Sequence, residues 1–245
     1  MMKNAFIIIT NPRSGSSWFI SMLRSRPDVN ARGELFNIPL QYPISEKEII
    51  TLGRWSDYKK LKKYTVPIFT IFEYLNKFYD GGQSGFKIML GQIFRNPAVI
   101  LYLATHPIRI IHLHRDNALD IVLSKAARRV RDVAHSNESV EKVAFTLDPD
   151  KTLSEVRTLI RHQRFTQLLC KILPNKVLSV RYEDLVANPR KWDEIQEFLF
   201  PESKPAKLAS QNRKLNNAPK NAILKNFEEI RSKFASAGLA HLCDN

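Results

Sequence analysis

The stretch from Ala5 to Arg24, AFIIITNPRSGSSWFISMLR, decides the fold of this chain. It begins with a short, isoleucine-rich run (Ala5–Thr10), which is typical of a strand buried on both faces. A polar loop with one proline, one arginine, one glycine and three serines follows, and a helical pattern starts near Trp18. A strand, a tight loop and a helix in this order are typical of phosphate-binding sites. The loop lacks the Lys-Ser or Lys-Thr of a nucleoside triphosphatase, so the stretch predicts an anion site of another kind.

Further strand and helix patterns alternate along the chain. Apolar runs predict strands at Gly85–Leu90, Ile108–His114 and Lys176–Tyr182, and helical periodicity predicts helices at Asn117–Val130 and Leu153–Leu173. This alternation favours a parallel sheet covered on both faces, because each connection has to cross over the sheet. We therefore expect an α/β fold, a P-loop-like doubly wound parallel sheet flanked by helices, with residues 1–245 forming a single domain.

Three segments fall outside this alternation. Residues 39–80 are rich in aromatic and basic side chains, and they predict helices inserted between the strand at Ala5–Thr10 and the strand at Gly85–Leu90. Residues 201–222 are polar and contain prolines, and a loop of that length in a compact domain is usually functional or disordered. The tail after it predicts one more helix, ended by Gly238.

The charge balance points to an anionic partner. The chain has 38 basic and 24 acidic residues, a net charge of +14. The basic residues are spread along the chain without the stripe or tail that nucleic-acid binding favours. Two lone cysteines and six scattered histidines show no metal-ligand spacing, so we expect no metal and a reducing compartment. The apolar run near the N-terminus is too short for a secretion signal or a membrane span, and the expected location is the cytoplasm.

The loop after the first strand offers several groups to an anion. Gly15 lets the backbone turn and approach a ligand closely. Ser16 and Ser17 supply hydroxyl groups where the next helix begins, and the first N–H groups of that helix have no partner within it. Arg13 adds a fixed positive charge. A serine-rich turn that merely caps a helix is the alternative, and the preceding strand favours the anion site.

A second set of candidate residues follows the strand at Ile108–His114. Arg115 comes directly after it, at the edge of the sheet where open α/β proteins bind ligands. Ser124 lies about two turns along the following helix. An arginine and a serine hydroxyl together can hold a second phosphate. The basic residues beyond them, Arg128 and Arg129, are better explained as a solvated helix face.

Taken together, these two motifs resemble a known enzyme family. The sequence PRSGSSW after the first strand, with an arginine, eight residues and a serine after a later strand, is similar to the sulfotransferases that use 3′-phosphoadenosine 5′-phosphosulfate. The similarity spans about Ala5–Phe36 and Gly85–Leu199, including VRYEDLVANPRKWDEIQEFL from Val180. It implies that Arg115 and Ser124 bind the 3′-phosphate. It also implies that the 5′-phosphosulfate is bound by Arg13, Ser14, Gly15, Ser16, Ser17 and Trp18.

The sequence also departs from the animal and plant cytosolic members of this family. Those enzymes usually have lysine in place of Arg13, one residue fewer between the arginine and the serine, and a later RKGxxGDW signature. The pattern is closer to bacterial carbohydrate sulfotransferases, including the trehalose and nodulation-factor types. In the loop at 201–222, Arg213 and Lys214 are candidates for the 3′-phosphate, with a solvated loop as the alternative.

The resemblance implies sulfuryl transfer without a metal. An acceptor oxygen attacks sulfur in line, and Arg13 neutralises charge on the transferring group. Glu34 is the candidate general base. The resemblance implies this role, because the bacterial carbohydrate sulfotransferases use a glutamate in this region as the base. His112 and His114 compete for that role. Lys87 is a candidate for contact with the bridging oxygen or the sulfuryl group, with a solvent-facing end of a strand as its alternative.

Two other functions have to be weighed. A P-loop-type kinase or phosphotransferase explains the first loop but lacks the loop lysine and a magnesium-binding aspartate after a strand. A non-catalytic anion- or nucleic-acid-binding module rests on net charge alone. We expect a small-molecule acceptor, a sugar or secondary metabolite sulfated on a hydroxyl more readily than on an amine, with aromatic residues of the segment 39–80 lining its pocket. We expect neither nucleic acid nor a membrane as partner, and a homodimer is left open.

Overall fold

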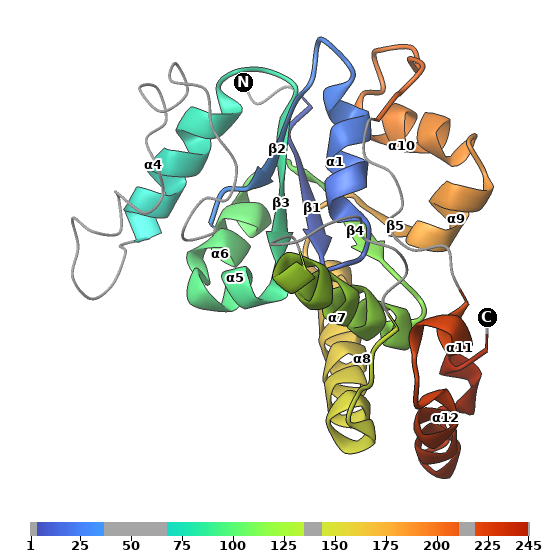
Figure 1. The fold of residues 1–245 in the computed structure, drawn as a ribbon. Helices are drawn as coiled ribbons and strands as arrows, with labels where there is room; N and C mark the ends of the chain where they lie inside the picture. Colours follow the sequence, from blue (N-terminus) through green and yellow to red (C-terminus); the bar gives the residue numbers. More distant parts are fainter. Residues whose placement is uncertain (1–3, 37–67, 135–143, 211–218, 245) are drawn as a thin grey trace.

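The structure is a computed structural model that describes residues 4–36, 68–134, 144–210 and 219–244. Within these residues the chain forms a five-stranded sheet (Figure 1). Its strands are β1 (Phe6–Thr10), β2 (Asn30–Glu34), β3 (Ser84–Met89), β4 (Arg109–His114) and β5 (Val177–Arg181). The spatial order is β2-β3-β1-β4-β5, and every neighbouring pair is parallel. The expected α/β fold with a parallel sheet is therefore confirmed.

Helices cover both faces of this sheet. One face is covered by α1 (Ser16–Arg24), α9 (Tyr182–Ala187) and α10 (Lys191–Leu199). The other face is covered by α4 (Ile68–Tyr79), α5 (Leu90–Arg95), α6 (Ala98–Thr105) and the end of α8 (Pro149–Ile172). Along β1, Phe6 and Ile8 point into the first cluster, and Ile7 and Ile9 point into the second. Because both faces are covered, the strand has no polar side, which explains its continuous apolar sequence.

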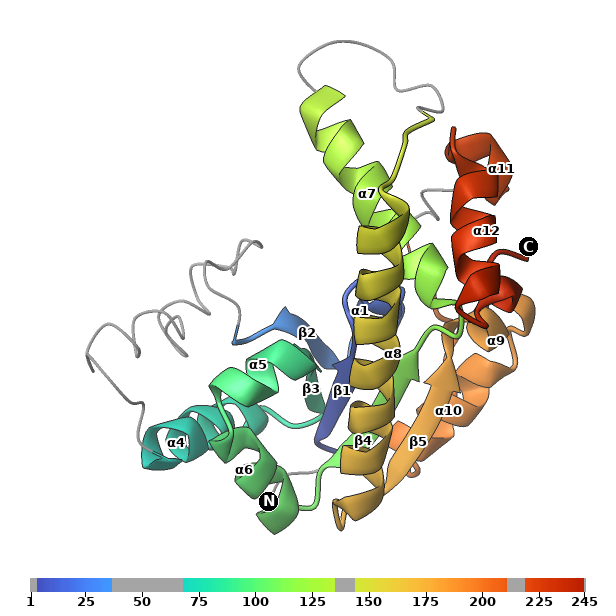
Figure 2. The same cartoon turned by 90° about the horizontal axis from the view of Figure 1, so that it is seen from below.

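A third apolar cluster lies beyond the carboxyl ends of the strands. It joins α7 (Ala118–Ala134) and the start of α8 to α11 (Lys220–Ile223), α12 (Phe227–Ser236) and the short helix η1 (Ala240–Leu242). With 24 residues, α8 is about 36 Å long, so it contributes Leu153 to this cluster and Cys170 to the cluster on the sheet. Figure 2 shows α7, α8 and α12 running alongside one another.

The strands and helices predicted at specified positions within the described residues are confirmed, but the sequence did not predict β2, α5 or α6. The expected loop at 201–222 ends too late, because Lys220–Ile223 form α11 and bury Ile223 in the third cluster. The predicted end of the last helix is confirmed: Gly238 has a φ of 72° and the Leu239 N–H bonds to the carbonyl of Phe234, as in a Schellman motif. Residues 39–67 and 211–218 lie outside the described residues. No helix among the described residues is long and apolar enough to cross a membrane.

Candidate anion-binding site

The carboxyl edge of the sheet brings the predicted site residues together. Glu34 ends β2, the Asn11–Gly15 loop follows β1, Arg115 follows β4 and Tyr182 follows β5. Since β1 lies between β3 and β4, the order of strands reverses there, and open α/β sheets bind ligands outside the strand ends at such a point. Arg213 and Lys214 lie outside the described residues, so their role stays a prediction.

The loop after β1 has an unusual backbone. Gly15 has a φ of 79°, as predicted for the turn, and Arg13 also has a positive φ, 64°. A positive φ is uncommon for a residue with a side chain, and backbone strain of this kind concentrates at functional sites. A Cβ atom at Gly15 would lie 2.3 Å from Cδ2 of Tyr182, so the ring leaves no room for a side chain. Both conformation and packing therefore require glycine at this position.

The loop presents the open N-terminus of α1. This helix begins at Ser16, has no side-chain hydrogen bond at its cap and has no acidic residue in its first turn. Its first N–H groups therefore keep their capacity to bind an anion. Ser14 differs from its neighbours, because its buried hydroxyl bonds to Thr10 Oγ1 at 3.0 Å and to the carbonyl of Asn11. The Ser14 side chain thus shapes the loop from inside.

Trp18 forms one wall beside this loop. Its ring packs edge-on against Tyr182, with centroids 5.9 Å apart, and against Trp192, with centroids 5.4 Å apart. Edge-to-face contacts of this kind add to the burial of the rings. The aromatic group therefore holds α1 against α9 and α10, and with it the position of the helix N-terminus.

Arg13 connects the two predicted motifs. Its Nε donates a hydrogen bond of 3.2 Å to the hydroxyl of Ser124, which lies 111 residues away in sequence on α7. The first loop and the helix after β4 therefore form one site. The sequence predicts both residues near the sheet edge, but their direct contact depends on how α7 packs.

Arg115 lies beside two carboxylates. Its Nη2 bonds to Asp120 Oδ2 at 2.7 Å, and its Nε is 3.6 Å from Glu183 Oε1. The guanidinium carbon also lies 5.3 Å from the centre of the Tyr182 ring. Arg115 is thus held by Asp120 and Glu183, whereas the Ser124 hydroxyl is held by Arg13. A phosphate that binds Arg115 has to share it with these carboxylates.

An ion pair between β2 and β3 forms the other side of the site. Glu34 Oε1 lies 3.3 Å from Lys87 Nζ, and both side chains are largely buried. Lys87 Nζ also donates a 3.2 Å hydrogen bond to the hydroxyl of Ser17 at the start of α1. The alternative of a solvent-facing Lys87 is therefore wrong, because its amine is enclosed between the Glu34 carboxylate and the first turn of α1.

An irregularity in β2 places Glu34 on this face of the sheet. Arg32 pairs with Phe86, yet Glu34, two residues later, pairs with Lys87. Because side chains alternate along a strand, an unbroken register would pair Gly33 with Lys87 and turn Glu34 to the opposite face. A bulge at a glycine is a common way to re-aim one side chain.

Gln92 is a site residue that sequence analysis missed. Its buried Oε1 accepts a 3.0 Å hydrogen bond from the Met89 N–H, which fixes the orientation of the amide. Its Nε2 therefore points at Glu34 and donates a 2.8 Å hydrogen bond to Oε2. Both oxygens of Glu34 thus have a protein donor, Lys87 on one and Gln92 on the other. No sequence pattern marks this glutamine, because Glu34 comes from β2, 58 residues earlier in the chain.

The histidines lie on the opposite face of the sheet. His112 pairs with Ile9 in the register, and Ile9 belongs to the cluster away from α1. Its Nδ1 lies 3.2 Å from the Ser179 hydroxyl, and its ring stacks on His114 with centroids 5.0 Å apart. Burial, aided by the nearby His114, lowers the pKa of His112 to about 4. His112 is therefore neutral near pH 7.

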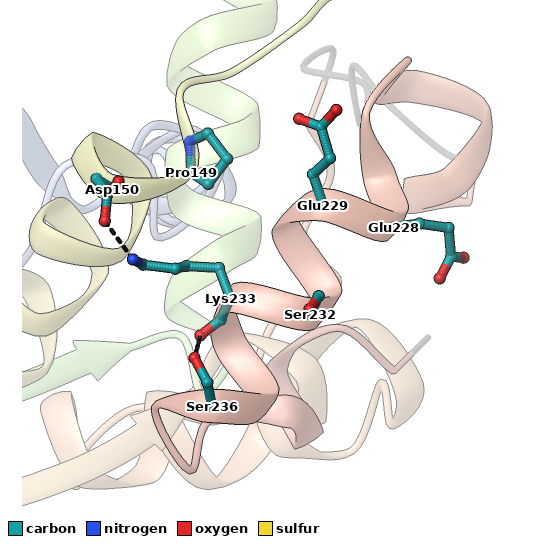
Figure 3. Close-up of a pocket in the computed structure, with 7 residues that line it drawn as sticks. All are labelled: Pro149, Asp150, Glu228, Glu229, Ser232, Lys233 and Ser236. Atoms are coloured by element: carbon teal, nitrogen blue, oxygen red, sulfur yellow. Dashed lines mark hydrogen bonds and ion pairs between the residues drawn. The ribbon is translucent and has the colours of Figure 1, made fainter.

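A surface hollow lies away from these residues. It is bounded by the first turn of α8 and one side of α12, as Figure 3 shows with its lining side chains. Lys233 Nζ and Asp150 Oδ1 form an ion pair of 2.5 Å across it. None of the residues singled out in the sequence lines this hollow. Among the described residues, no group of three or more His, Cys, Asp or Glu side chains is arranged to hold a metal.

No protein-family model and no curated protein matches the sequence. One similar solved structure is that of a sulfotransferase. It comes from Alicyclobacillus acidocaldarius, shares 14% sequence identity with the chain and superposes with a TM-score of 0.49. The match covers 98% of this chain and 95% of the other. Similarity at this level does not establish a shared family, so a function has to be argued from the geometry of the site.

Proposed function

We propose that the chain is a sulfotransferase that transfers a sulfuryl group from 3′-phosphoadenosine 5′-phosphosulfate to a hydroxyl group, less readily an amine, of a small molecule. The observation that carries the proposal is the hydrogen bond between Arg13 and Ser124. It makes the two motifs neighbours, and two adjoining anion sites suit a nucleotide with two separate phosphate groups. A single loop after β1 would suit many other anions equally well.

The donor would bind along the carboxyl edge of the sheet. The N-terminus of α1, with Ser16, Ser17 and Arg13, would hold the 5′-phosphosulfate. Ser124 and Arg115 would hold the 3′-phosphate, and Arg213 and Lys214 remain candidates for the same group. The product that leaves is then 3′-phosphoadenosine 5′-phosphate. Ser14 would contribute through the shape of the loop, and Trp18 through the position of α1.

The chemistry needs charge stabilisation and one proton acceptor. The acceptor oxygen forms a bond to sulfur as the bond from sulfur to the phosphate oxygen breaks, and the acceptor proton moves to Glu34. Arg13 and Lys87 stabilise the negative charge that develops on the sulfuryl and leaving phosphate oxygens. General-base catalysis of this kind typically contributes about 10²–10⁴-fold.

The placement of Glu34 supports it as the base. It shares a sheet face with Lys87 and the start of α1, through the ion pair and the hydrogen bond to Ser17. His112, the competing candidate, lies on the other face of the sheet, and its lowered pKa makes it a weak proton acceptor. A carboxylate next to the N-terminus of α1 fits the role better than a buried imidazole on the opposite face of the sheet.

The acceptor is restricted less closely. In the described part of the aromatic segment, Tyr74, Phe78 and Tyr79 of α4 are buried in the cluster on the sheet, so they serve the core. A sugar or secondary metabolite remains the proposed acceptor class, and the cytoplasm the proposed location.

A binding comparison tests the donor. We expect calorimetry to show tighter binding of adenosine 3′,5′-bisphosphate than of ATP with magnesium or of an oligonucleotide. Ser124→Ala should weaken bisphosphate binding, and Ser154→Ala, which removes an exposed serine on α8, should not. Tighter binding of ATP with magnesium would support a phosphotransferase and reject the proposal. Preference for the oligonucleotide would support a nucleic-acid-binding module.

A transfer assay tests the chemistry. Labelled donor is incubated with a library of small alcohols, sugars and amines, and products are identified by mass spectrometry. We expect Arg13→Ala to abolish nearly all transfer. Glu34→Gln should lower turnover while bisphosphate affinity stays unchanged, because the carboxylate acts on the acceptor. Normal turnover in Glu34→Gln would reject it as the base.

A further inference from the structure

No acidic side chain comes from α5, from α6 or from α8 beyond Glu155, and these segments form one surface of the described part of the chain. The sequence has no Asp or Glu from residue 81 to 115 or from 156 to 182. The two stretches meet at this surface, where the ring centroids of Phe94 on α5 and Phe165 on α8 lie 5.4 Å apart. Figure 2 shows α8 in front of the sheet on this side of the molecule. In a chain with 24 acidic residues, a surface without any is a distinct electrostatic feature.

Four exposed cations lie on the outward side of α8. They are Arg157, Arg161, Arg164 and Lys171, and none of them forms an ion pair with another described residue. The first turn of the same helix differs, since Lys151 lies 3.9 Å from Asp148. The unpaired charges therefore belong to the acid-free surface, and its electrostatic complement is an anionic partner.

Large apolar side chains lie among these cations. Phe165, Leu168 and Ile172 are exposed on α8, with Ile172 at 71%, and Phe94 extends the patch onto α5. At 100° per residue, the cations and apolar residues of α8 share an arc of about 120°, with the apolar ones toward one side. Grouped exposed apolar side chains mark interaction surfaces more often than scattered ones do.

We propose that this basic, apolar face of α8 and α5 docks on the surface of an anionic lipid bilayer. A bilayer offers negative headgroups to the arginines and an apolar layer to Phe165, Leu168 and Ile172, and it needs no matching groove for a protruding helix. A second copy of the chain fits poorly, because a symmetric contact would set cations against cations. Nucleic acid would match the charge but leave the aliphatic side chains without a role.

This inference stands apart from the proposed sulfuryl transfer. It also departs from the sequence-based expectation of no membrane partner, which came from the lengths of apolar runs. Run length tests for a spanning segment, whereas a surface contact depends on which exposed residues the fold places side by side.

Vesicle sedimentation with the full chain tests the proposal. We expect binding to vesicles that contain phosphatidylglycerol, at least tenfold weaker binding to phosphatidylcholine alone, and release by added salt. Arg161→Glu combined with Arg164→Glu should reduce binding at least tenfold. The control pair Lys204→Glu and Lys207→Glu makes the same change of net charge at exposed positions elsewhere and should bind like the wild type.

The apolar contribution is tested separately. Leu168→Ser combined with Ile172→Ser should weaken binding several-fold, whereas Val186→Ser, at an exposed apolar residue of α9, should not. Equal binding to both kinds of vesicle, or equal losses in the control variants, would overturn the proposal. Sedimentation velocity gives one more outcome that would overturn it. If the wild type forms a dimer and the Leu168→Ser, Ile172→Ser variant does not, the face binds a second copy of the chain. Thermal unfolding of each variant is the control that tests whether the fold is retained.

Discussion

Gly15→Ala is predicted to disturb the anion site far more than an ordinary glycine substitution. Gly15 has a φ of 79°, and an alanine in this conformation costs about 1 kcal/mol. The new Cβ would also lie 2.3 Å from the Tyr182 ring, which is itself packed against Trp18 and Arg115. Overpacking of this kind costs about 1–3 kcal/mol, so we expect a total near 3 kcal/mol.

Gly238→Ala is the matched control. Gly238 has a similar φ, 72°, but no atom of a residue other than its neighbours in the chain lies within 4 Å of where its Cβ would be. It should therefore cost only the conformational part, about 1 kcal/mol. Urea unfolding measures both variants, and calorimetry with adenosine 3′,5′-bisphosphate should show weakened binding in Gly15→Ala alone. If both variants lose the same stability and both bind the bisphosphate as the wild type does, the Tyr182 ring does not pack against Gly15 and does not shape the anion site.

The remaining predictions concern the buried polar groups around the sheet. The pKa of His112 is lowered from 6.5 to about 4, so the unfolded chain protonates this imidazole more readily than the folded chain does. The free energy of unfolding should therefore decrease by about 3 kcal/mol as the pH falls from 6.5 to below 4. The urea midpoint should therefore depend less on pH in His112→Asn, and an unchanged slope would contradict the assignment. Lys87→Met should cost about 3 kcal/mol by leaving Glu34 buried without its cation, and adding Glu34→Gln should recover part of this loss; no recovery would count against the ion pair. Gln92→Leu should lower turnover and leave bisphosphate affinity unchanged, because it removes a donor that orients Glu34; a loss confined to binding would exclude this role.

Sequence patterns were sufficient for much of the fold. The isoleucine-rich run of β1 and the stripe of α8 follow from side-chain periods that tertiary contacts did not override. The turn at Gly15 was also predictable, because its conformation is local and glycine adopts it without strain. β2 was missed because its sequence, NARGE, has no apolar run, and an edge strand is buried only in part.

The sequence by itself determined four of the five strands, the long helices α7 and α8, and which residues reach the carboxyl edge of the sheet. These properties depend on short-range periodicity and on the positions of glycine, arginine and serine next to strand ends. The tertiary structure alone decided that Arg13 bonds to Ser124, that Gln92 orients Glu34, and that His112 lies behind the sheet. Each of these depends on the register and packing of segments far apart in the chain. A single irregularity in β2 is enough to turn Glu34 from one face to the other, because side chains alternate at every residue of a strand.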